Sequence, residues 1–286
     1  MSLPDYIEGI GSVAHKYEGF ILDLWGVVHD GVKPLPFTID TLKAMKKARR
    51  RIWMLSNAPR RAHVVEQKLN EMGVGKELYD GIMTSGEASH MALRDKYLAK
   101  WGKKCYHLGP HEKDKNLYEG LDIIIVEKPS EANFVLNTGV KDFDDTAEQY
   151  APVLAECIAA KLPMLCANPD RVVHVEDKLV VCPGAFADMY EKLEGEVQWF
   201  GKPYRSVYTE CLKGLGVENV LAVGDGMMTD IAGATGAGLD SALVTGGIHR
   251  DELLDGVLQV ADETRLREFL LRYPYKPSYL LSAFFW

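Results

Sequence analysis

Four short apolar runs in this chain each lead into residues that can do chemistry. The residues that follow these runs are Asp23, Ser56-Asn57, Lys202, and Asp225 with Asp230. Carboxylates can hold a divalent cation such as Mg²⁺, a lysine can neutralise a phosphate group, and hydroxyl and amide groups can hydrogen-bond its oxygens. These residue types therefore suit a site that binds a metal ion together with a phosphorylated small molecule.

Each residue also has a plain structural explanation. Asp23 could cap a turn, Lys202 could be a solvated surface lysine, and Asp230 could be a helix N-cap. Their common position favours the chemical interpretation, because the carboxyl ends of parallel strands meet at one edge of a sheet, where ligands bind.

The elements that would position these residues alternate in type. Apolar runs at 20–23, 52–55 and 81–85 predict strands, and amphipathic segments at 38–51, 60–72 and 86–100 predict helices. This alternation predicts a Rossmann-like parallel sheet with right-handed crossovers. A weak leading helix is also predicted over residues 3–18.

The pattern of the sequence changes from about Lys103, which predicts a second, smaller α/β domain. Short strand candidates follow one another there, including a hairpin formed by 172–175 and 178–181. The core pattern resumes near residue 199. We therefore expect a core domain of 1–85 plus 199–286 and an inserted cap domain of 86–198.

The order of the motifs resembles that of the haloacid dehalogenase superfamily of phosphatases. The GDxxxTD segment Gly224–Asp230 and the triplet Gly201-Lys202-Pro203 are fairly specific, and Ser56-Asn57 alone would be a weak signal. The insertion, together with Asn168-Pro169-Asp170, resembles the α/β-capped subfamily IIA, which includes NagD-like and nitrophenyl-phosphatase-like members.

The resemblance implies a nucleophile and a metal site. Asp23 would attack phosphorus to form an aspartyl-phosphate. Mg²⁺ would be held by the carboxylates of Asp23 and Asp225 and by the backbone carbonyl of Trp25.

The same resemblance implies a phosphate site. Ser56, Asn57 and Lys202 would bind phosphoryl oxygens, and Lys202 would reduce the repulsion between the dianion and the nucleophile. Asp230 would orient Lys202 or a metal-bound water.

Trp25 departs from the family pattern, which has a second aspartate there as general acid and base. A tryptophan cannot move a proton, and that role is typically worth ~10²–10⁴ in rate. His29, a few residues further on, is the nearest substitute acid or base. Asp170 and His174 in the cap are candidates for substrate contact, although turn chemistry would also explain Asp170. Dehalogenation ranks low, because that branch has neither this cap nor the GDxxxTD motif.

Composition limits the partners. The net charge of −8 argues against a nucleic-acid partner. No export signal or membrane-spanning run is evident, and the five cysteines lack disulfide or metal spacing, which predicts a cytoplasmic, soluble protein with reduced thiols. The apolar residues 279–286 should pack on the core or on another subunit, so a homo-oligomer stays open.

Two classes of function remain. The first is a Mg²⁺-dependent phosphatase acting on a small phosphorylated metabolite, such as a sugar phosphate or a nucleotide. The second is a catalytically weak, phosphate-binding or regulatory relative, which Trp25 favours. A phosphatase screen with and without Mg²⁺ distinguishes them.

Overall fold

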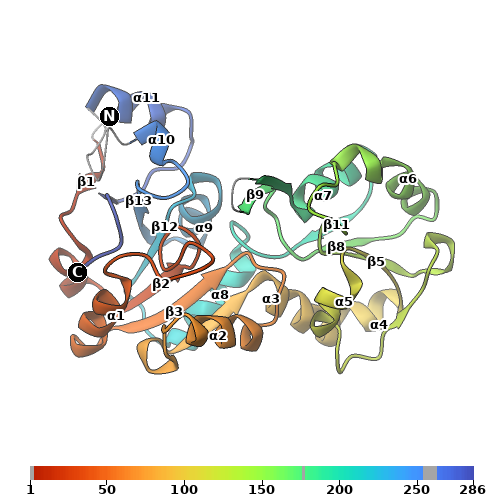
Figure 1. Cartoon of the computed structure of the whole chain (residues 1–286), viewed down its shortest axis with the longest axis horizontal. Helices are drawn as coiled ribbons and strands as arrows, with labels where there is room; N and C mark the ends of the chain where they lie inside the picture. The colour runs from red at the N-terminus through yellow and green to blue at the C-terminus, as the bar shows by residue number, and fades with distance from the viewer. Residues whose placement is uncertain (1–2, 176–177, 254–262) are drawn as a thin grey trace. The chain divides into compact units, whose positions relative to one another are not determined.

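The chain forms two compact units, each built on its own β-sheet (Figure 1). The structure, a computed structural model, describes residues 3–175, 178–253 and 263–286. The core unit comprises Met1–Ser56, His63–Met83 and Lys202–Trp286, and the cap unit comprises Asn57–Ala62 and Thr84–Gly201. The predicted α/β class, with a smaller α/β cap inserted into a parallel-sheet core, is confirmed. The exact domain boundaries given above stay a prediction.

The core unit is organised around one sheet. Its strands within the described residues are, in spatial order, β1 (Asp5–Tyr6), β14 (Tyr279–Leu281), β13 (Asp240–Val244), β12 (Val220–Gly224), β2 (Gly19–Asp23), β3 (Arg51–Ser56) and β4 (Gly81–Thr84). The pairings from β1 across to β3 are all parallel. Parallel pairing requires long crossovers, and helices supply most of them.

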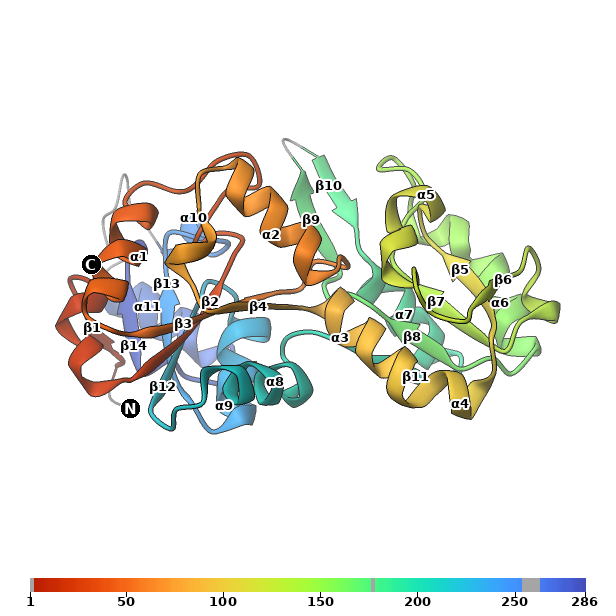
Figure 2. The same ribbon diagram turned by 90° about the horizontal axis from the view of Figure 1, so that it is seen from below.

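Helices pack on both sides of this sheet. They are α1 (Thr38–Lys47), α2 (Ala62–Glu71), α8 (Arg205–Leu215), α9 (Ala232–Ala237), α10 (Arg250–Leu253) and α11 (Glu263–Leu271), with the π-helical turn η8 (Met227–Ile231) and the 3-10 turns η1 (Ile10–Ser12), η2 (Ala14–Lys16) and η3 (Lys76–Leu78). Helices α1 and α2 lie on one side, and α8 and α9 lie on the other (Figure 2). The central strands read as continuous apolar runs because both sheet faces are covered.

Successive side chains of β13 pack on opposite faces of the core sheet. Ala242 and Val244 belong to the cluster that contains Leu22, whereas Leu243 packs in a second cluster with Phe269. Successive side chains of a strand point to opposite faces, so one strand contributes to both clusters. The strand ends are thereby held by packing on each side.

The cap unit has its own parallel sheet. Its strands in spatial order are β11 (Val197–Trp199), β8 (Met164–Cys166), β7 (Phe134–Asn137), β5 (Lys104–Leu108) and β6 (Ile124–Ile125). The predicted hairpin is present as the antiparallel pair β9 (Val172–Val175) and β10 (Lys178–Val181). The helices and turns are α3 (Ser85–Ala92), the π-helical η4 (Leu93–Tyr97), α4 (Leu98–Trp101), α5 (His111–Asp114), η5 (Lys115–Leu117), η6 (Pro129–Glu131), η7 (Ala147–Tyr150), α6 (Ala151–Ala159) and α7 (Pro183–Lys192).

The predicted leading helix over residues 3–18 is wrong. That segment contains β1, which pairs with β14, followed by two short 3-10 turns. A Cβ atom at Gly9 would lie 2.7 Å from the backbone carbon of Trp286, so the segment is shaped by close contact with the C-terminal residues. Helical periodicity alone could not reveal a contact between opposite ends of the sequence.

The apolar C-terminal segment packs on the core unit of its own chain. Phe284 is buried in the core cluster, and the Ile10 N–H donates to the Phe285 carbonyl at 2.8 Å. The five cysteines are buried and unpaired, as predicted. Within the described part of the chain, none of the helices combines the length and apolarity that crossing a membrane requires.

Candidate functional site

Two acidic residues sit side by side because their strands are neighbours. Asp23 is the last residue of β2, and Asp225 comes directly after β12. In the register between these strands, Leu22 pairs with Val223. The predicted juxtaposition of Asp23 and Asp225 at the carboxyl edge of the sheet is therefore present.

Lys202 completes a buried cluster with three carboxylates. Its Nζ donates to Asp23 Oδ1 at 2.5 Å and to Asp230 Oδ1 at 2.8 Å. One carboxylate oxygen from each of Asp23, Asp225 and Asp230 lies within 4.8 Å of the others. All four residues are buried. Lys202 is thus no solvated surface lysine.

The electrostatics of the cluster favour a bound cation. Burial and the nearby Asp230 carboxylate raise the pKa of Asp23. The same two causes raise the pKa of Asp225 to about 7. Burial alone would lower the pKa of Lys202, but Asp23 and Asp230 outweigh it and hold the ammonium charged. When all three carboxylates are ionised they outnumber the single ammonium, so a bound cation would relieve the repulsion that raises these pKa values, and oxygen donors of this kind suit Mg²⁺.

Two glycines cradle the carboxylate of Asp225. A Cβ atom at Gly26 would lie 1.9 Å from Asp225 Oδ2, and one at Gly247 would lie 2.2 Å from it. The same oxygen accepts a hydrogen bond of 2.8 Å from the Ile248 N–H. Gly247 was not among the predicted site residues. It lies three residues past the end of β13, near the edge of the sheet where ligands bind, and this position was the available signal.

Asp230 is fixed by the turn that contains it. The turn η8 lets its Oδ2 accept hydrogen bonds from the Gly226 N–H at 3.1 Å and from Thr229 Oγ1 at 3.2 Å. Its Oδ1 receives Lys202, as described above. This arrangement suits the predicted role of Asp230 in orienting Lys202, because both of its oxygens have defined donors.

Ser56 is the last residue of β3 and Asn57 follows it, and the two residues have different surroundings. Leu55 pairs with Asp23, so the buried Ser56 is one residue past the nucleophile candidate in the adjacent strand. Asn57 is buried in the cap unit, and its Nδ2 donates to Asp170 Oδ1 at 2.8 Å. Phosphate binding by these two residues stays a prediction, and the Asn57–Asp170 contact was not foreseen.

Trp25 carries no acid to the site. Trp25 is 43% exposed and its indole packs on Gly31, where a Cβ atom would lie 2.4 Å from Cη2. The His29 ring contacts it edge-on, with the ring centroids 5.7 Å apart. The backbone carbonyl of Trp25 as a metal ligand stays a prediction.

His29 is buried and held as a neutral ring. Burial and the charge of Lys68 lower its pKa to about 4. Its Nδ1 accepts a hydrogen bond of 2.9 Å from the Gly31 N–H, which leaves the single proton on Nε2. An imidazole in this state has no extra proton to donate near neutral pH. A role as acid or base stays a prediction, which this environment does not favour.

Asp170 and His174, the candidates for substrate contact, both lie in the cap unit. The Asp170 carbonyl accepts a hydrogen bond of 2.9 Å from the Gly184 N–H, and its own N–H donates to Asn168 Oδ1 at 2.8 Å. Asp170 is therefore held by the turn chemistry that its sequence indicated. His174 lies in β9, but its side chain falls outside the described residues.

The fold and site together define a class of α/β proteins with a parallel core sheet, an inserted cap and a carboxylate–lysine cluster at the strand ends. Family models described as "Haloacid dehalogenase-like hydrolase" and "HAD-hyrolase-like" match residues 20–123 and 199–268. A solved hydrolase of the haloacid dehalogenase-like family from Brucella suis is 30% identical, with a TM-score of 0.82 over 97% of this chain and 99% of that one. The chain belongs to the haloacid dehalogenase-like family, in the α/β-capped subfamily IIA.

Characterised relatives are more distant in sequence. A D-glycerol 3-phosphate phosphatase of Mycobacterium tuberculosis is 25% identical over 83% of this chain. The alignment spans 65% of that relative's own length. The 5'-nucleotidase YutF of Bacillus subtilis is 23% identical over 82% of this chain and 90% of its own length. Both names describe enzymes that remove phosphate from small molecules.

Proposed function

We propose that this protein is a Mg²⁺-dependent phosphatase that acts on a small phosphorylated metabolite through an aspartyl-phosphate on Asp23. The observation that carries the proposal is the buried cluster in which Lys202 bridges Asp23 and Asp230 beside Asp225. Its charge and donor set match a divalent cation and a phosphoryl group, and the relatives named as phosphatases support the same reaction.

The contacts of Lys202 with Asp23 and Asp230 support the following proposed roles. A carboxylate oxygen of Asp23 attacks phosphorus, the bond to the leaving oxygen breaks, and water then hydrolyses the acyl-phosphate. Lys202 neutralises charge on the phosphoryl oxygens while Asp230 holds its ammonium in place. Ser56 and Asn57 donate to the phosphoryl oxygens.

The metal site is proposed from the same cluster. Asp23, Asp225 and the Trp25 carbonyl would hold Mg²⁺, which when bound supplies positive charge against the dianionic phosphoryl group. The cradle formed by Gly26, Gly247 and the Ile248 N–H holds Asp225 Oδ2 and so fixes the orientation of this carboxylate.

The finer features of the substrate are also proposals. A sugar phosphate, a glycerol phosphate or a nucleotide fits the class of the relatives, with Asp170 and His174 as candidates for contact. The cytoplasmic location and a homo-oligomer stay predictions from the sequence.

A phosphatase assay tests the proposal directly. The wild type should release phosphate from a panel of small phosphate esters only when Mg²⁺ is present, and Asp23→Asn should lose this activity because an amide cannot form the acyl-phosphate. Asp251→Asn, an exposed acid-to-amide change in α10, serves as the matched control and should keep full activity. Equal activity of Asp23→Asn and wild type would rule out Asp23 as the nucleophile.

A second candidate is a phosphate-binding relative with little turnover. Trp25 favours it, because the residue replaces a proton-transfer group with an indole. Binding of inorganic phosphate in the presence of Mg²⁺, without hydrolysis of any ester including nitrophenyl phosphate, would favour this candidate.

A further inference from the structure

Two places where the chain passes from one unit to the other lie directly beside proposed phosphate-binding residues. Ser56 is the last residue of a core-unit stretch, and Asn57 is the first residue of a cap-unit stretch. Gly201 is the last residue of the cap unit, and Lys202 resumes the core unit. Consecutive Cα atoms lie about 3.8 Å apart. Whatever fixes Asn57 and Gly201 in the cap unit therefore limits where Ser56 and Lys202 can lie.

These two chain passages meet at one turn of the cap unit, the Asn-Pro-Asp turn formed by residues 168–170. Asn57 Nδ2 donates to Asp170 Oδ1 at 2.8 Å. A Cβ atom at Gly201 would lie 2.6 Å from Asn57 Oδ1 and 2.7 Å from Pro169 Cδ, and the φ of Gly201 is +120°. Glycine tolerates both this conformation and this close approach. The side chain of Asn57 is thus held between Asp170 and Gly201.

The Asn-Pro-Asp turn is itself fixed by contacts with its own backbone. The Asp170 N–H donates to Asn168 Oδ1 at 2.8 Å, and the Gly184 N–H in α7 donates to the Asp170 carbonyl at 2.9 Å. A Cβ atom at Gly184 would lie 2.3 Å from the Pro169 carbonyl oxygen, so α7 and the turn are in close contact. The Asp170 carboxylate therefore reaches Asn57 from a defined position.

Other bonds hold the cap-unit stretch of residues 57–62 without Asp170. Ser85 Oγ donates to the Asn57 carbonyl at 2.6 Å. The guanidinium of Arg61 makes two bonds to the Glu87 carboxylate, at 2.7 and 3.2 Å. The backbone of this stretch should therefore keep its fold when Asp170 is replaced, and only the hold on the Asn57 side chain is lost.

We propose that Asp170 is a positioning residue for the proposed phosphatase site and that it acts through Asn57. By holding the Asn57 side chain beside Gly201, it fixes the spacing of the two chain passages. A hydrogen bond to a charged acceptor is about twice as strong as one between neutral groups, which suits this task. This role rests on the proposed function, and it differs from direct contact with the leaving group because it acts on the residues that bind the phosphoryl group.

Inorganic phosphate distinguishes the two roles, because it has a phosphoryl group and no organic leaving group. Asp170→Ala should weaken the binding of inorganic phosphate in the presence of Mg²⁺ by about fivefold, as measured by titration calorimetry. It should lower kcat/KM by a similar factor for nitrophenyl phosphate and for glycerol phosphate. A residue that contacts only the leaving group would leave phosphate binding unchanged and affect the two esters unequally.

A double-mutant cycle tests whether Asp170 acts through Asn57. In an Asn57→Ala background, Asp170→Ala should have no further effect on phosphate binding, because the side chain that it holds is already gone. Asp170→Asn keeps an acceptor without the charge, so it should weaken phosphate binding less, by about twofold. It takes the place of Asp170→Ala in the cycle if the alanine variant does not fold.

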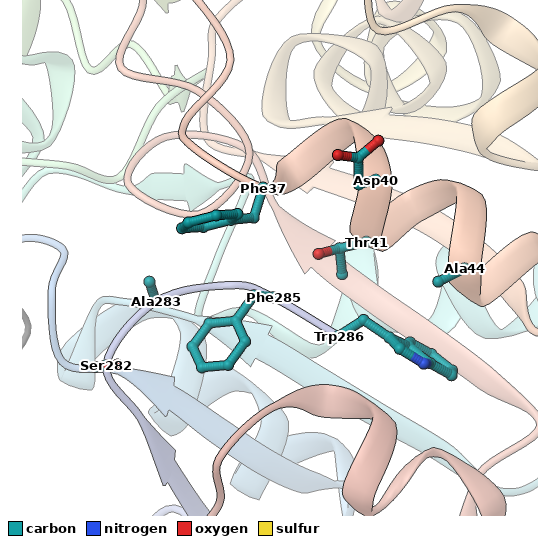
Figure 3. Close-up of a pocket in the computed structure, with 8 residues that line it drawn as sticks. All are labelled: Phe37, Asp40, Thr41, Ala44, Ser282, Ala283, Phe285 and Trp286. Carbon is teal, nitrogen blue, oxygen red and sulfur yellow. The ribbon is translucent and has the colours of Figure 1, made fainter.

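Asp40→Ala is the control for the loss of an acidic side chain. Asp40 lies in the first turn of α1, in the wall of an open pocket whose lining includes no residue of the Asn-Pro-Asp turn. Figure 3 shows its carboxylate turned away from Phe285 and Trp286. This variant should bind phosphate and hydrolyse both esters as the wild type does.

Unchanged phosphate binding in a folded Asp170→Ala variant would overturn the positioning role. An equal effect of Asp170→Ala in the wild-type and Asn57→Ala backgrounds would also overturn it. In both cases, hydrolysis by the wild type would leave the proposed function intact. A folded wild type that neither binds phosphate nor hydrolyses either ester would overturn the proposed function itself, and the positioning role with it.

Discussion

At the scale of one residue, Trp25 limits which leaving groups the proposed reaction can expel. The indole packs on Gly31 beside a His29 ring that is neutral near pH 7, so we expect neither side chain to supply a proton to the leaving oxygen. The leaving group must then depart largely as an anion. Substrates whose leaving groups are stable anions are therefore favoured.

We expect a steep dependence of kcat/KM on leaving-group pKa, with nitrophenyl and acyl phosphates preferred to alkyl phosphates. Trp25→Asp should flatten this dependence and raise turnover of alkyl phosphates, with ~10²–10⁴-fold as the ceiling for a restored acid. The measurement is a series of aryl and alkyl phosphates assayed on both proteins, after thermal unfolding shows that the variant folds. Little leaving-group dependence in the wild type would show that another group donates the proton. A loss confined to poor leaving groups in His29→Asn would then identify that residue.

Gly247 allows a second test of the metal site. A ligand that binds only the folded state raises stability by mass action, about 2.7 kcal/mol at one hundred times the dissociation constant. Gly247→Ala places a methyl group 2.2 Å from Asp225 Oδ2 and should reduce the Mg²⁺-dependent rise in Tm. Gly236→Ala is the matched control, because its Cβ meets nothing within 4 Å in α9. It should leave the Mg²⁺ effect unchanged. An equal Mg²⁺ effect in both variants would argue against Asp225 as a ligand.

At the scale of single elements, residues next to the ends of strands hold neighbouring elements together. Asp80, just before β4, accepts a hydrogen bond of 2.7 Å from the Ile52 N–H at the start of β3 and an ion pair of 3.1 Å from Lys46 in α1. Burial alone would raise the pKa of Asp80, but the Ile52 N–H and Lys46 outweigh it and lower the pKa. One side chain therefore joins a helix to two strands.

Asp80→Asn should lower the free energy of unfolding by about 1 kcal/mol at pH 7. A carboxyl with a lowered folded-state pKa contributes stability above its unfolded pKa and loses it as the pH falls through the folded value. The difference between wild type and variant should therefore shrink below about pH 4, close to the ordinary aspartate pKa. Urea denaturation at pH 7 and at pH 3 measures it. A constant difference at both pH values would assign the effect to packing instead of charge.

The helices and strands also show which structural features the sequence could predict. An apolar run that ends in Asp23 or leads into Asp225 predicts both the strand and the position of the carboxylate, because parallel strands end at a common edge. The Asn57–Asp170 contact and the neutral state of His29 depend on residues that tertiary folding brings together. Local patterns contain no information about such partners. The prediction of a leading helix over residues 3–18 was wrong for the same reason, because it took no account of contacts with the C-terminal residues.

At the scale of the whole molecule, the core unit and the cap unit have separate hydrophobic clusters among the described residues. The core unit holds the candidate ligands Asp23 and Asp225, whereas Phe186 is fully buried in a cap cluster of its own. The net charge of −8 does not attract an anionic substrate over long range. Binding then depends on Lys202 and on the cation that the core unit is proposed to hold.

Separate cores should give the two units separate stabilities. Phe186→Ala removes a buried ring from the cap core and should cost about 3–5 kcal/mol there. Leu42→Ala, at a fully buried position in α1, should cost about 2–5 kcal/mol in the core unit. Calorimetry should show Phe186→Ala lowering one transition and Leu42→Ala lowering the other. Mg²⁺ should raise only the transition that Leu42→Ala lowers, because its candidate ligands lie in that unit. If both variants lower a single transition that Mg²⁺ raises, the two units unfold together, and the cap depends on the core for its stability.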